Sequence, residues 1–341
     1  MDHIAIDLGS RESQICVRDS AGTILHEKKL DNRHLRELFD CPKAVVSMET
    51  CSEAFTIAAW AAGKGHVVRV VPATLVRSLG VGARRTKNDR KDAQALSAAS
   101  CRIDLPSVHV PSLWSQEVKS LCGMRDILVG SRTKCTNSVR GWLRTQVIRP
   151  RVTRSSLAKK LRADFEDRGE ALPAHVELQL VAIESLTEQI KTADARAEAM
   201  ADANATCVLL MTAPGIGPLT SLRFAAALDK CDRFEDAHRV ASYLGLAPGE
   251  DSSSTRQRIT SITKAGPAAV RWLLVEAAWR ALRWKPNDPM CQWALKIAVK
   301  RGKRIAVTAL ARKLAGVLYA MWRDNKPYDP ARGAPATEPA V

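Results

Sequence analysis

The sequence lacks three features that would place it in other classes of protein. No apolar run approaches the roughly 18 residues that a membrane-spanning helix needs. The nine cysteines are scattered and odd in number, with no Cys-x-x-Cys pair, which argues against a disulfide framework and against a zinc site. The chain begins with a polar strand pattern instead of a signal peptide. We therefore expect a cytoplasmic protein with reduced thiols and no membrane partner.

Acidic residues are also absent from two long tracts. Residues 127–163 contain ten Lys and Arg, residues 289–323 contain eight, and neither tract has an Asp or Glu. A solvated helix face usually mixes both signs, so these tracts, within a net charge of +16, favour binding to nucleic-acid phosphates. The expected contacts, in these tracts and elsewhere, are Arg84, Arg85, Lys87, Arg132, Lys134, Arg140, Arg144, Gly215, Gly217, Arg256, Arg258, Lys264, Lys300, Arg301, Lys303 and Arg304.

The 341 residues exceed one ordinary hydrophobic core, and their patterns divide into four parts. Residues 1–110 alternate strand and helix patterns, which predicts an α/β domain. Residues 111–205 predict basic helices and a coiled-coil connector. Residues 206–324 predict a mainly helical domain, and residues 325–341 a flexible tail. The fold class is therefore α/β followed by all-α.

The coiled-coil prediction rests on one long helix pattern, 175–204. Its apolar residues from 186 to 200 recur at alternating steps of four and three, which is the spacing of a coiled-coil seam. Such a seam is compatible with a hairpin inside one chain and with a contact between two chains.

Acidic residues occupy the ends of two predicted strands and the start of a predicted helix in the first domain. Asp7 ends the first apolar strand pattern, and Glu49 ends a later one. Asp89 and Asp92 lie three apart, and hence on one face, where a helix pattern begins. Acids in a first helical turn also have an ordinary explanation, because the helix dipole favours them.

The order of strands and helices in this domain is that of an RNase H-like layer. In such a layer the ends of the first and fourth strands and a late helix converge, and the four acids occupy those places. Clustered carboxylates repel one another, and a divalent cation relieves that repulsion. Oxygen ligands of this kind suit Mg²⁺ or Mn²⁺, and two such ions suit displacement at a phosphodiester.

The run Ile6-Asp7-Leu8-Gly9-Ser10 also resembles the first phosphate loop of sugar kinases and actin-like ATPases. That interpretation requires a second phosphate hairpin rich in Asp and Gly, in a duplicated domain. The sequence contains no such hairpin.

Two motifs stand out in the second half. Gly215-Ile216-Gly217 joins two apolar helix patterns, in the form of a helix-hairpin-helix whose glycines let a phosphate approach the backbone. A plain tight turn explains the glycines equally well. The run Ser252-Ser253-Ser254, followed by Arg256 and Arg258, has the residue types to hold a phosphate against a hydroxyl nucleophile, although serine clusters are ordinarily loops and caps.

The chain resembles the insertion-sequence transposases that join an N-terminal RuvC-like DEDD domain to a C-terminal serine-bearing domain, the bridge-RNA-guided recombinases. The resemblance covers about residues 3–322. Its motifs are Ile6-Asp7-Leu8-Gly9, Met48-Glu49-Thr50, Thr86-Lys87-Asn88-Asp89-Arg90-Lys91-Asp92-Ala93, Pro214-Gly215-Ile216-Gly217, Tyr243-Leu244-Gly245-Leu246-Ala247-Pro248 and Ile262-Thr263-Lys264-Ala265-Gly266.

This resemblance implies roles for particular residues. Asp7, Glu49, Asp89 and Asp92 would be the DEDD ligands of Mg²⁺ or Mn²⁺. Counting back from Ile262-Thr263-Lys264 implies Ser253 as the nucleophile that forms a phosphoserine with DNA. In the family a glycine usually follows that serine, but Ser254 stands there in this chain. The departure leaves the two neighbouring serines as alternatives.

The resemblance also implies the partners. These are donor and target DNA, a structured guide (bridge) RNA, and further copies of the chain in a dimer of dimers, in the bacterial cytoplasm at the nucleoid. The predicted function is an RNA-guided DNA transposase or recombinase. Two alternatives stay open: a Holliday-junction resolvase or RNase H-like nuclease that hydrolyses with the four carboxylates alone, and a non-catalytic architectural protein that binds nucleic acid.

Overall fold

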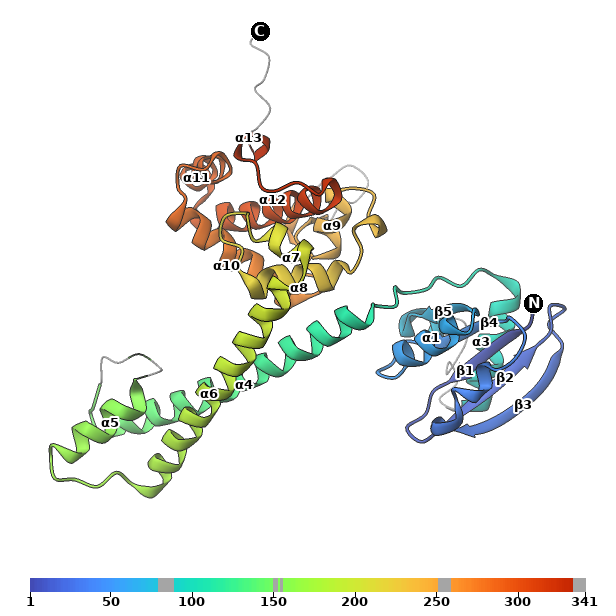
Figure 1. Cartoon of the computed structure of the whole chain (residues 1–341), viewed down its shortest axis with the longest axis horizontal. Coiled ribbons are helices and arrows are strands. Elements are labelled where there is room, and N and C mark those ends of the chain that lie inside the picture. The colour runs from blue at the N-terminus through green and yellow to red at the C-terminus, as the bar shows by residue number, and fades with distance from the viewer. Residues whose placement is uncertain (79–88, 150–152, 154–155, 251–258, 334–341) are drawn as a thin grey trace, which may run out of the picture. The chain divides into compact units, whose positions relative to one another are not determined.

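The computed structural model describes residues 1–78, 89–149, 153, 156–250 and 259–333, and for residues 76–78, 89, 259 and 332–333 the backbone alone. The chain forms two compact units, Met1–Pro111 and Ser112–Val341 (Figure 1). The first is a mixed α/β domain and the second is mainly helical, as predicted. The finer division into four parts stays a prediction.

The first unit is built on a five-stranded sheet. Its strands lie in the order β3-β2-β1-β4-β5, with β1, β2 and β3 antiparallel and with β4 and β5 parallel to β1. This order is the one expected of an RNase H-like layer. The elements are β1 (His3–Asp7), β2 (Glu12–Arg18), β3 (Ile24–Asp31), the 3-10 turns Asn32–His34 and Glu37–Phe39, β4 (Val45–Glu49), α1 (Ala54–Gly63), β5 (Val67–Val71), α2 (Ala73–Ser78) and α3 (Asp89–Arg102).

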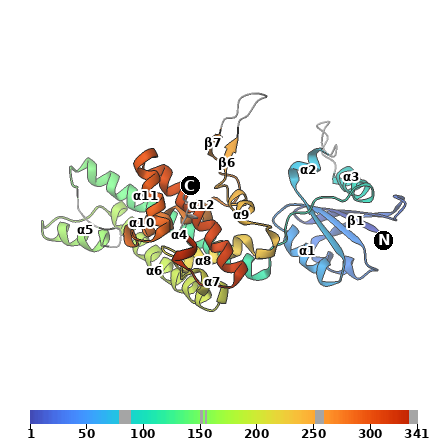
Figure 2. The same cartoon turned by 90° about the horizontal axis from the view of Figure 1, so that it is seen from above.

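Alternation along the strands gives the sheet two apolar faces. Ile4 and Ile6 of β1 pack with Met48 and with alanines of α1 in one buried cluster. Ala5, between them in the sequence, packs instead with Leu96 of α3. Successive side chains of a strand point to opposite faces, so α1 and α3 cover opposite sides of the sheet (Figure 2). This arrangement decides which side chains α3 meets.

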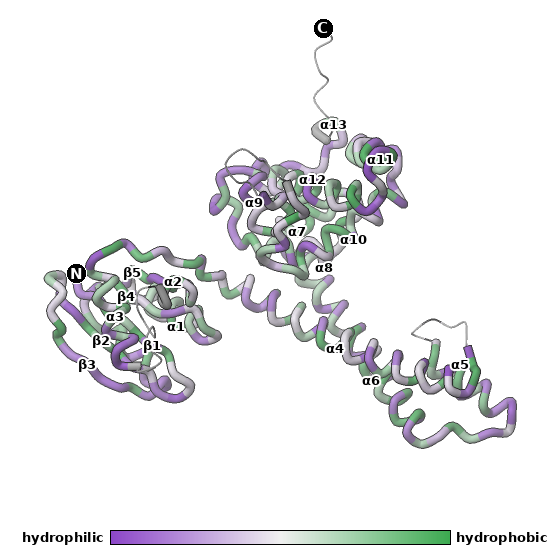
Figure 3. Tube along the Cα trace, turned by 180° about the vertical axis from the view of Figure 1, so that it is seen from behind, coloured by the Kyte–Doolittle hydropathy of each residue, from purple (hydrophilic) through white to green (hydrophobic). Residues whose placement is uncertain are grey.

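The second unit begins with two long helices that pack along each other, α4 (Leu113–Thr145) and α6 (Ala174–Asp202), with α5 (Leu157–Glu166) near one end (Figures 1 and 3). Near the end of α4, Leu143 packs with Val176 at the start of α6. Near the start of α4, Val118 packs with Ala197 at the end of α6. The two helices are therefore antiparallel, and the buried part of the predicted seam is used within the chain.

The remaining helices enclose one apolar core. Buried side chains of α10 and α12 supply much of it. The elements are α7 (Ala205–Leu210), α8 (Pro218–Leu228), a 3-10 turn (Cys231–Arg233), α9 (Ala237–Tyr243), β6 (Pro248–Glu250), β7 (Ile259–Ile262), α10 (Ala268–Trp284), α11 (Pro289–Arg301), α12 (Lys303–Asp324) and α13 (Pro330–Gly333).

One helix, α12, differs from the expectation that no segment is long and apolar enough to span a membrane. It is long and apolar enough, by length and composition alone, to cross a membrane. Half of its most apolar window is buried inside the protein, where Leu310, Leu314 and Leu318 belong to the core. A core helix meets the same criterion, and these buried leucines account for the composition of α12.

Two glycines lock the segments on either side of the β6–β7 hairpin together. Gly245 and Gly266 both have positive φ, 69° and 74°. A Cβ on Gly245 would lie 2.1 Å from the Ala265 carbonyl oxygen, and a Cβ on Gly266 would lie 2.0 Å from that of Tyr243. Arg271 of α10 donates to the carbonyl oxygens on both segments, at 2.9 Å each. The motifs that contain Gly245 and Gly266 therefore pack together as one interlocked base of the hairpin.

The segment predicted as a flexible tail begins with residues that pack on the helical domain. The Tyr328 hydroxyl donates to the carboxylate of Asp288, at 2.8 and 2.9 Å, and the Tyr328 amide donates to the Thr212 hydroxyl. Burial raises the pKa of Tyr328, so the hydroxyl stays protonated as a donor. Residues 334–341 lie outside the described residues.

The interlocked glycines give a stability prediction. Gly266→Ala places a methyl group on a backbone oxygen at a left-handed φ, and we expect it to lower the free energy of unfolding by about 2 kcal/mol or more. Urea denaturation followed by circular dichroism measures the loss. Gly123→Ala, in the interior of α4 with no atom near the added Cβ, is the matched control and should raise stability by about 0.5–1 kcal/mol. Similar stabilities for the two variants would refute the packing argument.

Candidate active site

Two of the predicted metal ligands end adjacent strands. Asp7 is the last residue of β1 and Glu49 the last residue of β4. The two strands are parallel, with Ile6 opposite Met48, so the same register continued by one residue brings Asp7 beside Glu49. Both residues are partly exposed. The sheet thus places two carboxylates at the same edge.

Strand alternation points both carboxylates to the face that α3 covers. Asp7 lies two residues after Ala5, which packs against α3. Glu49 lies opposite Val71 of β5, and Val71 belongs to the same buried cluster as Leu96 of α3. Directly opposed residues of neighbouring strands share a face.

The direction of α3 brings its first turn to this edge. Ser100, near the end of α3, bonds His3 at the start of β1, with 2.8 Å between Oγ and Nδ1. Ser97, one turn earlier, donates to the thiol of Cys16, whose strand partner is Ala5. From Ser100 back to Asp92 the helix rises about 12 Å, and from His3 to Asp7 the strand advances about 13 Å. Asp92 therefore lies at the level of Asp7.

A carboxylate on β3 holds the start of α3. One Glu27 oxygen accepts two hydrogen bonds from the Arg90 guanidinium, at 2.6 and 3.0 Å. The other accepts from the Gln94 amide at 2.6 Å. The side chain of Glu27 is only 13% exposed. Its hydrogen bonds with Arg90 lower the pKa of Glu27, so it stays ionised. Because Arg90 lies between Asp89 and Asp92, this clamp orients the turn that carries both.

The structure thus brings Asp7, Glu49 and Asp92 to one edge of one face of the sheet. Asp89 begins α3, but its side chain lies outside what the structure describes. Among the described residues, no three His, Cys, Asp or Glu side chains are close enough to hold a metal ion together. Carboxylate oxygens are the donors that Mg²⁺ and Mn²⁺ prefer, so the donor chemistry fits while the four-ligand set stays a prediction.

The predicted nucleophile belongs to the β6–β7 hairpin. β6 and β7 pair antiparallel, with Glu250 opposite Ile259, and the residues between them carry the serine run. The predicted residues that lie outside the described part of the chain are Arg84, Arg85, Lys87, Ser252, Ser253, Ser254, Arg256 and Arg258.

The four predicted nucleic-acid contacts of the first basic tract, all in α4, differ in exposure. Lys134 and Arg144 of α4 are exposed. Arg132 is half-buried, with its Nη1 3.5 Å from the Thr187 hydroxyl of α6 and its Nε without a hydrogen-bond partner among the described residues. Arg140 is half-buried as well. Lys134 and Arg144 are therefore the more accessible of the four to a phosphate backbone.

The other predicted cations lie in the helical domain. Lys264, directly after the hairpin, is exposed and has a left-handed φ of 57°. Lys300 and Arg301 end α11, Lys303 and Arg304 begin α12, and all four are exposed.

The two glycines of the Gly-x-Gly turn have different surroundings. Gly215 has a φ of 80°, and a Cβ there would lie 2.3 Å from the carbonyl oxygen of Ala277 in α10. Gly217 precedes α8, and a Cβ on it would meet nothing within 4 Å. Close packing on α10 thus accounts for Gly215, and a phosphate contact at either glycine stays a prediction.

Comparison with known families decides the class of the protein. The model for DEDD transposases of the IS110 type matches residues 4–148, which include the acidic edge. The model described as transposase IS116/IS110/IS902 family matches residues 207–290, which include the hairpin and its interlocked base. The chain belongs to this transposase family. It is therefore an enzyme of DNA transposition, as the sequence motifs predicted.

Named relatives of this IS110-family transposase match it over most of its length. A probable family 20 transposase of Pseudomonas aeruginosa is 28% identical over 97% of this chain and 99% of its own length. The transposase of insertion sequence element IS1111A from Coxiella burnetii is 26% identical over 95% of this chain and 90% of its own. A pilin gene-inverting protein of Moraxella bovis is 25% identical over 80% of this chain and 78% of its own.

Two residues that position parts of the transposase were missed from the sequence. Glu27 lies in a strand of mixed polar residues, and nothing in the sequence places it beside Arg90, 63 positions later. Arg271 lies five residues after the motif that ends at Gly266, but its two carbonyl acceptors are set by tertiary packing.

The Glu27 clamp gives a prediction about local stability. Glu27→Ala removes both acceptors, and we expect amide hydrogen exchange in the first turns of α3 to accelerate on the order of tenfold. Hydrogen exchange read by mass spectrometry measures the change. Glu12→Ala, which removes the exposed Lys29–Glu12 pair on neighbouring strands, is the control and should leave α3 unchanged. Equal exchange in α3 for both variants would show that the clamp does not hold the helix.

Proposed function

We propose that the chain is an RNA-guided DNA transposase that cuts and rejoins strands through a phosphoserine intermediate, aided by a DEDD metal site. The observation that carries the metal site is the convergence of Asp7, Glu49 and the first turn of α3 at one edge of an RNase H-like sheet. The match of this domain to the DEDD transposase model supports the same assignment.

The proposed chemistry conserves phosphoester bonds. The Ser253 oxygen attacks a DNA phosphorus, loses its proton, and displaces a deoxyribose oxygen that leaves as a hydroxyl. A hydroxyl of a second strand then attacks the phosphoserine, restores a phosphodiester and releases the serine. A bound Mg²⁺ would supply Lewis-acid stabilisation of the charge on the transferring phosphoryl group. Asp7, Glu49, Asp89 and Asp92 would hold that ion, and the Glu27 clamp would orient the turn that presents the last two.

The proposed partners follow from the charge and the family. Donor and target DNA and a structured guide RNA supply the phosphates for the exposed cations of α4, α11 and α12. A dimer of dimers would bring the acidic edge of one copy to the serine of another. We place the protein in the bacterial cytoplasm, at the nucleoid.

One observation favours rejoining over hydrolysis. A relative that matches most of this chain is named a pilin gene-inverting protein. Inversion requires that cut strands be rejoined, and a hydrolytic nuclease leaves them open. The resolvase or nuclease alternative therefore ranks second, and the non-catalytic architectural alternative third.

The covalent step has a direct test. The protein is incubated with Mg²⁺, its cognate RNA and labelled donor DNA, and a DNA-linked protein is sought after denaturation. We expect an adduct that Ser253→Ala abolishes, because the serine oxygen forms the bond. Cleavage without an adduct would indicate the hydrolytic nuclease, and binding alone the architectural protein. An adduct that persists in Ser253→Ala and disappears in Ser252→Ala or Ser254→Ala would identify that other serine as the nucleophile.

The metal site has a separate test. Asp92→Asn keeps the size of the side chain and removes its charge, and we expect strand exchange to fall on the order of a hundredfold. Asp194→Asn, on the partly exposed surface of α6, is the control and should exchange strands at the wild-type rate. Gel assays of exchange over a Mg²⁺ titration measure both. Wild-type exchange by Asp92→Asn would remove that residue from the site.

A further inference from the structure

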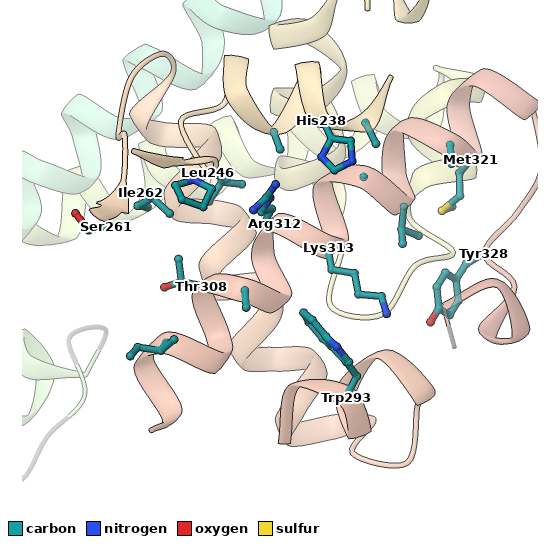
Figure 4. Close-up of a pocket in the computed structure, with 18 of the residues that line it drawn as sticks. His238, Leu246, Ser261, Ile262, Trp293, Thr308, Arg312, Lys313, Met321 and Tyr328 are labelled. Atoms are coloured by element: carbon teal, nitrogen blue, oxygen red, sulfur yellow. The ribbon is translucent and has the colours of Figure 1, made fainter. Parts of the chain in front are cut away.

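A groove of about 1500 Å³ runs along one side of α12 in the helical domain (Figure 4). Residues of α9 and of the β6–β7 hairpin line one wall, among them His238 and Ile262. Residues of α11 and of the segment after α12 line the other, among them Trp293 and Tyr328.

One face of α12 forms the floor of the groove in two rows. Arg304, Thr308 and Arg312 recur at steps of four, and Ile305 lies beside them in the second row. Each step of four residues advances about 6 Å along a helix. The first row therefore offers two guanidiniums and a hydroxyl along one line, and the second offers apolar contact next to it.

The close approach of α9 to α12 shapes the wall of the groove that α9 and the β6–β7 hairpin form. Gly316 of α12 lies against Ala237 of α9, where an added Cβ would be 3.3 Å from the Ala237 side chain. The small residue lets α9 pack close to α12. The wall of the groove is therefore part of the folded domain, and no bound molecule is needed to form it.

The charge of the groove is strongly positive. None of Arg301, Arg304 and Arg312 has an ion-pair partner among the residues that the structure describes. Lys313 lies over the Trp293 ring, 4.7 Å from its centroid, and burial lowers the pKa of Lys313. Among the described residues of the lining, Asp329 is the one acidic side chain. Such a site attracts an anionic ligand.

The mixture of cations and apolar surface narrows the class of ligand. Duplex DNA buries the faces of its bases and presents phosphates, so it would leave the apolar lining without a partner. An unpaired strand presents both phosphates and base faces, and proteins bind such strands with cations and apolar or aromatic surfaces together. An apolar helix of another protein would leave the cations without partners.

We propose that this groove binds an unpaired nucleic-acid strand, with phosphates on Arg304 and Arg312 and bases against the apolar row that includes Ile305. Ile305 is 46% exposed, so its side chain is accessible to a base in the groove. The strand, DNA or RNA, would lie beside the hairpin that carries the serine run. Only this last point, the use of the strand in the reaction, rests on the proposed function.

The test measures strand binding without Mg²⁺, in a background that carries Ser252→Ala, Ser253→Ala and Ser254→Ala together, so that no candidate serine can form a covalent bond. Labelled unpaired DNA, unpaired RNA of the same sequence and blunt duplex DNA are titrated by fluorescence anisotropy at several salt concentrations. For Arg304→Ala with Arg312→Ala we expect about tenfold weaker binding of an unpaired strand and a salt slope shallower by about 1.4, with duplex binding unchanged. The RNA and DNA arms show which strand the groove takes.

Two further variants separate the groove from general charge and from misfolding. Lys134→Ala with Arg144→Ala removes two exposed cations of α4 and should weaken unpaired and duplex DNA to a similar extent. Ile305→Ala should weaken unpaired strands about fivefold or more without altering the salt slope. Arg304→Lys with Arg312→Lys should restore the salt slope, and thermal denaturation checks the fold of each variant.

The proposal fails if the double alanine variant binds unpaired strands as its parent does, or loses duplex binding equally. It also fails if the variant alters self-association in sedimentation while strand binding stays intact, because the occupant would then be another copy of the chain. The adduct assay with wild-type protein is independent of these outcomes. The groove and the proposed function can therefore fail separately.

Discussion

The attachment of α3 to the sheet is the constraint on which the proposed metal site depends. Four polar side chains along one helix, Arg90, Gln94, Ser97 and Ser100, each bond a residue of the sheet. These bonds set both the height and the rotation of the helix. Rotation by one residue would turn Asp92 away from the edge where β1 and β4 end, because successive helical side chains are about 100° apart. The direction of the Asp92 carboxylate thus depends on contacts in its own turn and up to about two turns away.

The ion pairs of a basic tract in the fold cannot be read from the charges near it in the sequence. The first basic tract has no acid in sequence, yet its Arg162 bonds Glu177 and Glu184 of α6, at 2.7 Å to each. Their carboxylates raise the pKa of Arg162, so its charge is compensated inside the chain. In the second tract, Arg301, Arg304 and Arg312 have no such partner among the described residues. A count of charges in sequence therefore overestimates the number of uncompensated cations in the first tract.

The interlocked glycines also have partners that are distant in sequence. Tyr243-Leu244-Gly245 and Ala265-Gly266 look like two short motifs in sequence, but in the fold each closes on the other's backbone. Their residue types follow from close approach and from left-handed φ values. They hold the hairpin, and the groove along α12 opens beside it.

Patterns of residues close together in sequence were sufficient to predict many of the strands and helices of this protein. Alternation and turn residues predicted the strands that end at Asp7 and Glu49, and helical periodicity predicted α6 and the start of α3, because each depends on residues close in sequence. The sheet's two-faced burial, the Glu27 clamp and the compensation of Arg162 depend on residues tens of positions apart. The order of the strands and the direction of α3 decide which of these meet, and no local pattern encodes that. The sequence by itself determined the acids, the cations and the family. Tertiary packing alone decided which acids share an edge, which cations stay exposed, and that a groove runs along α12.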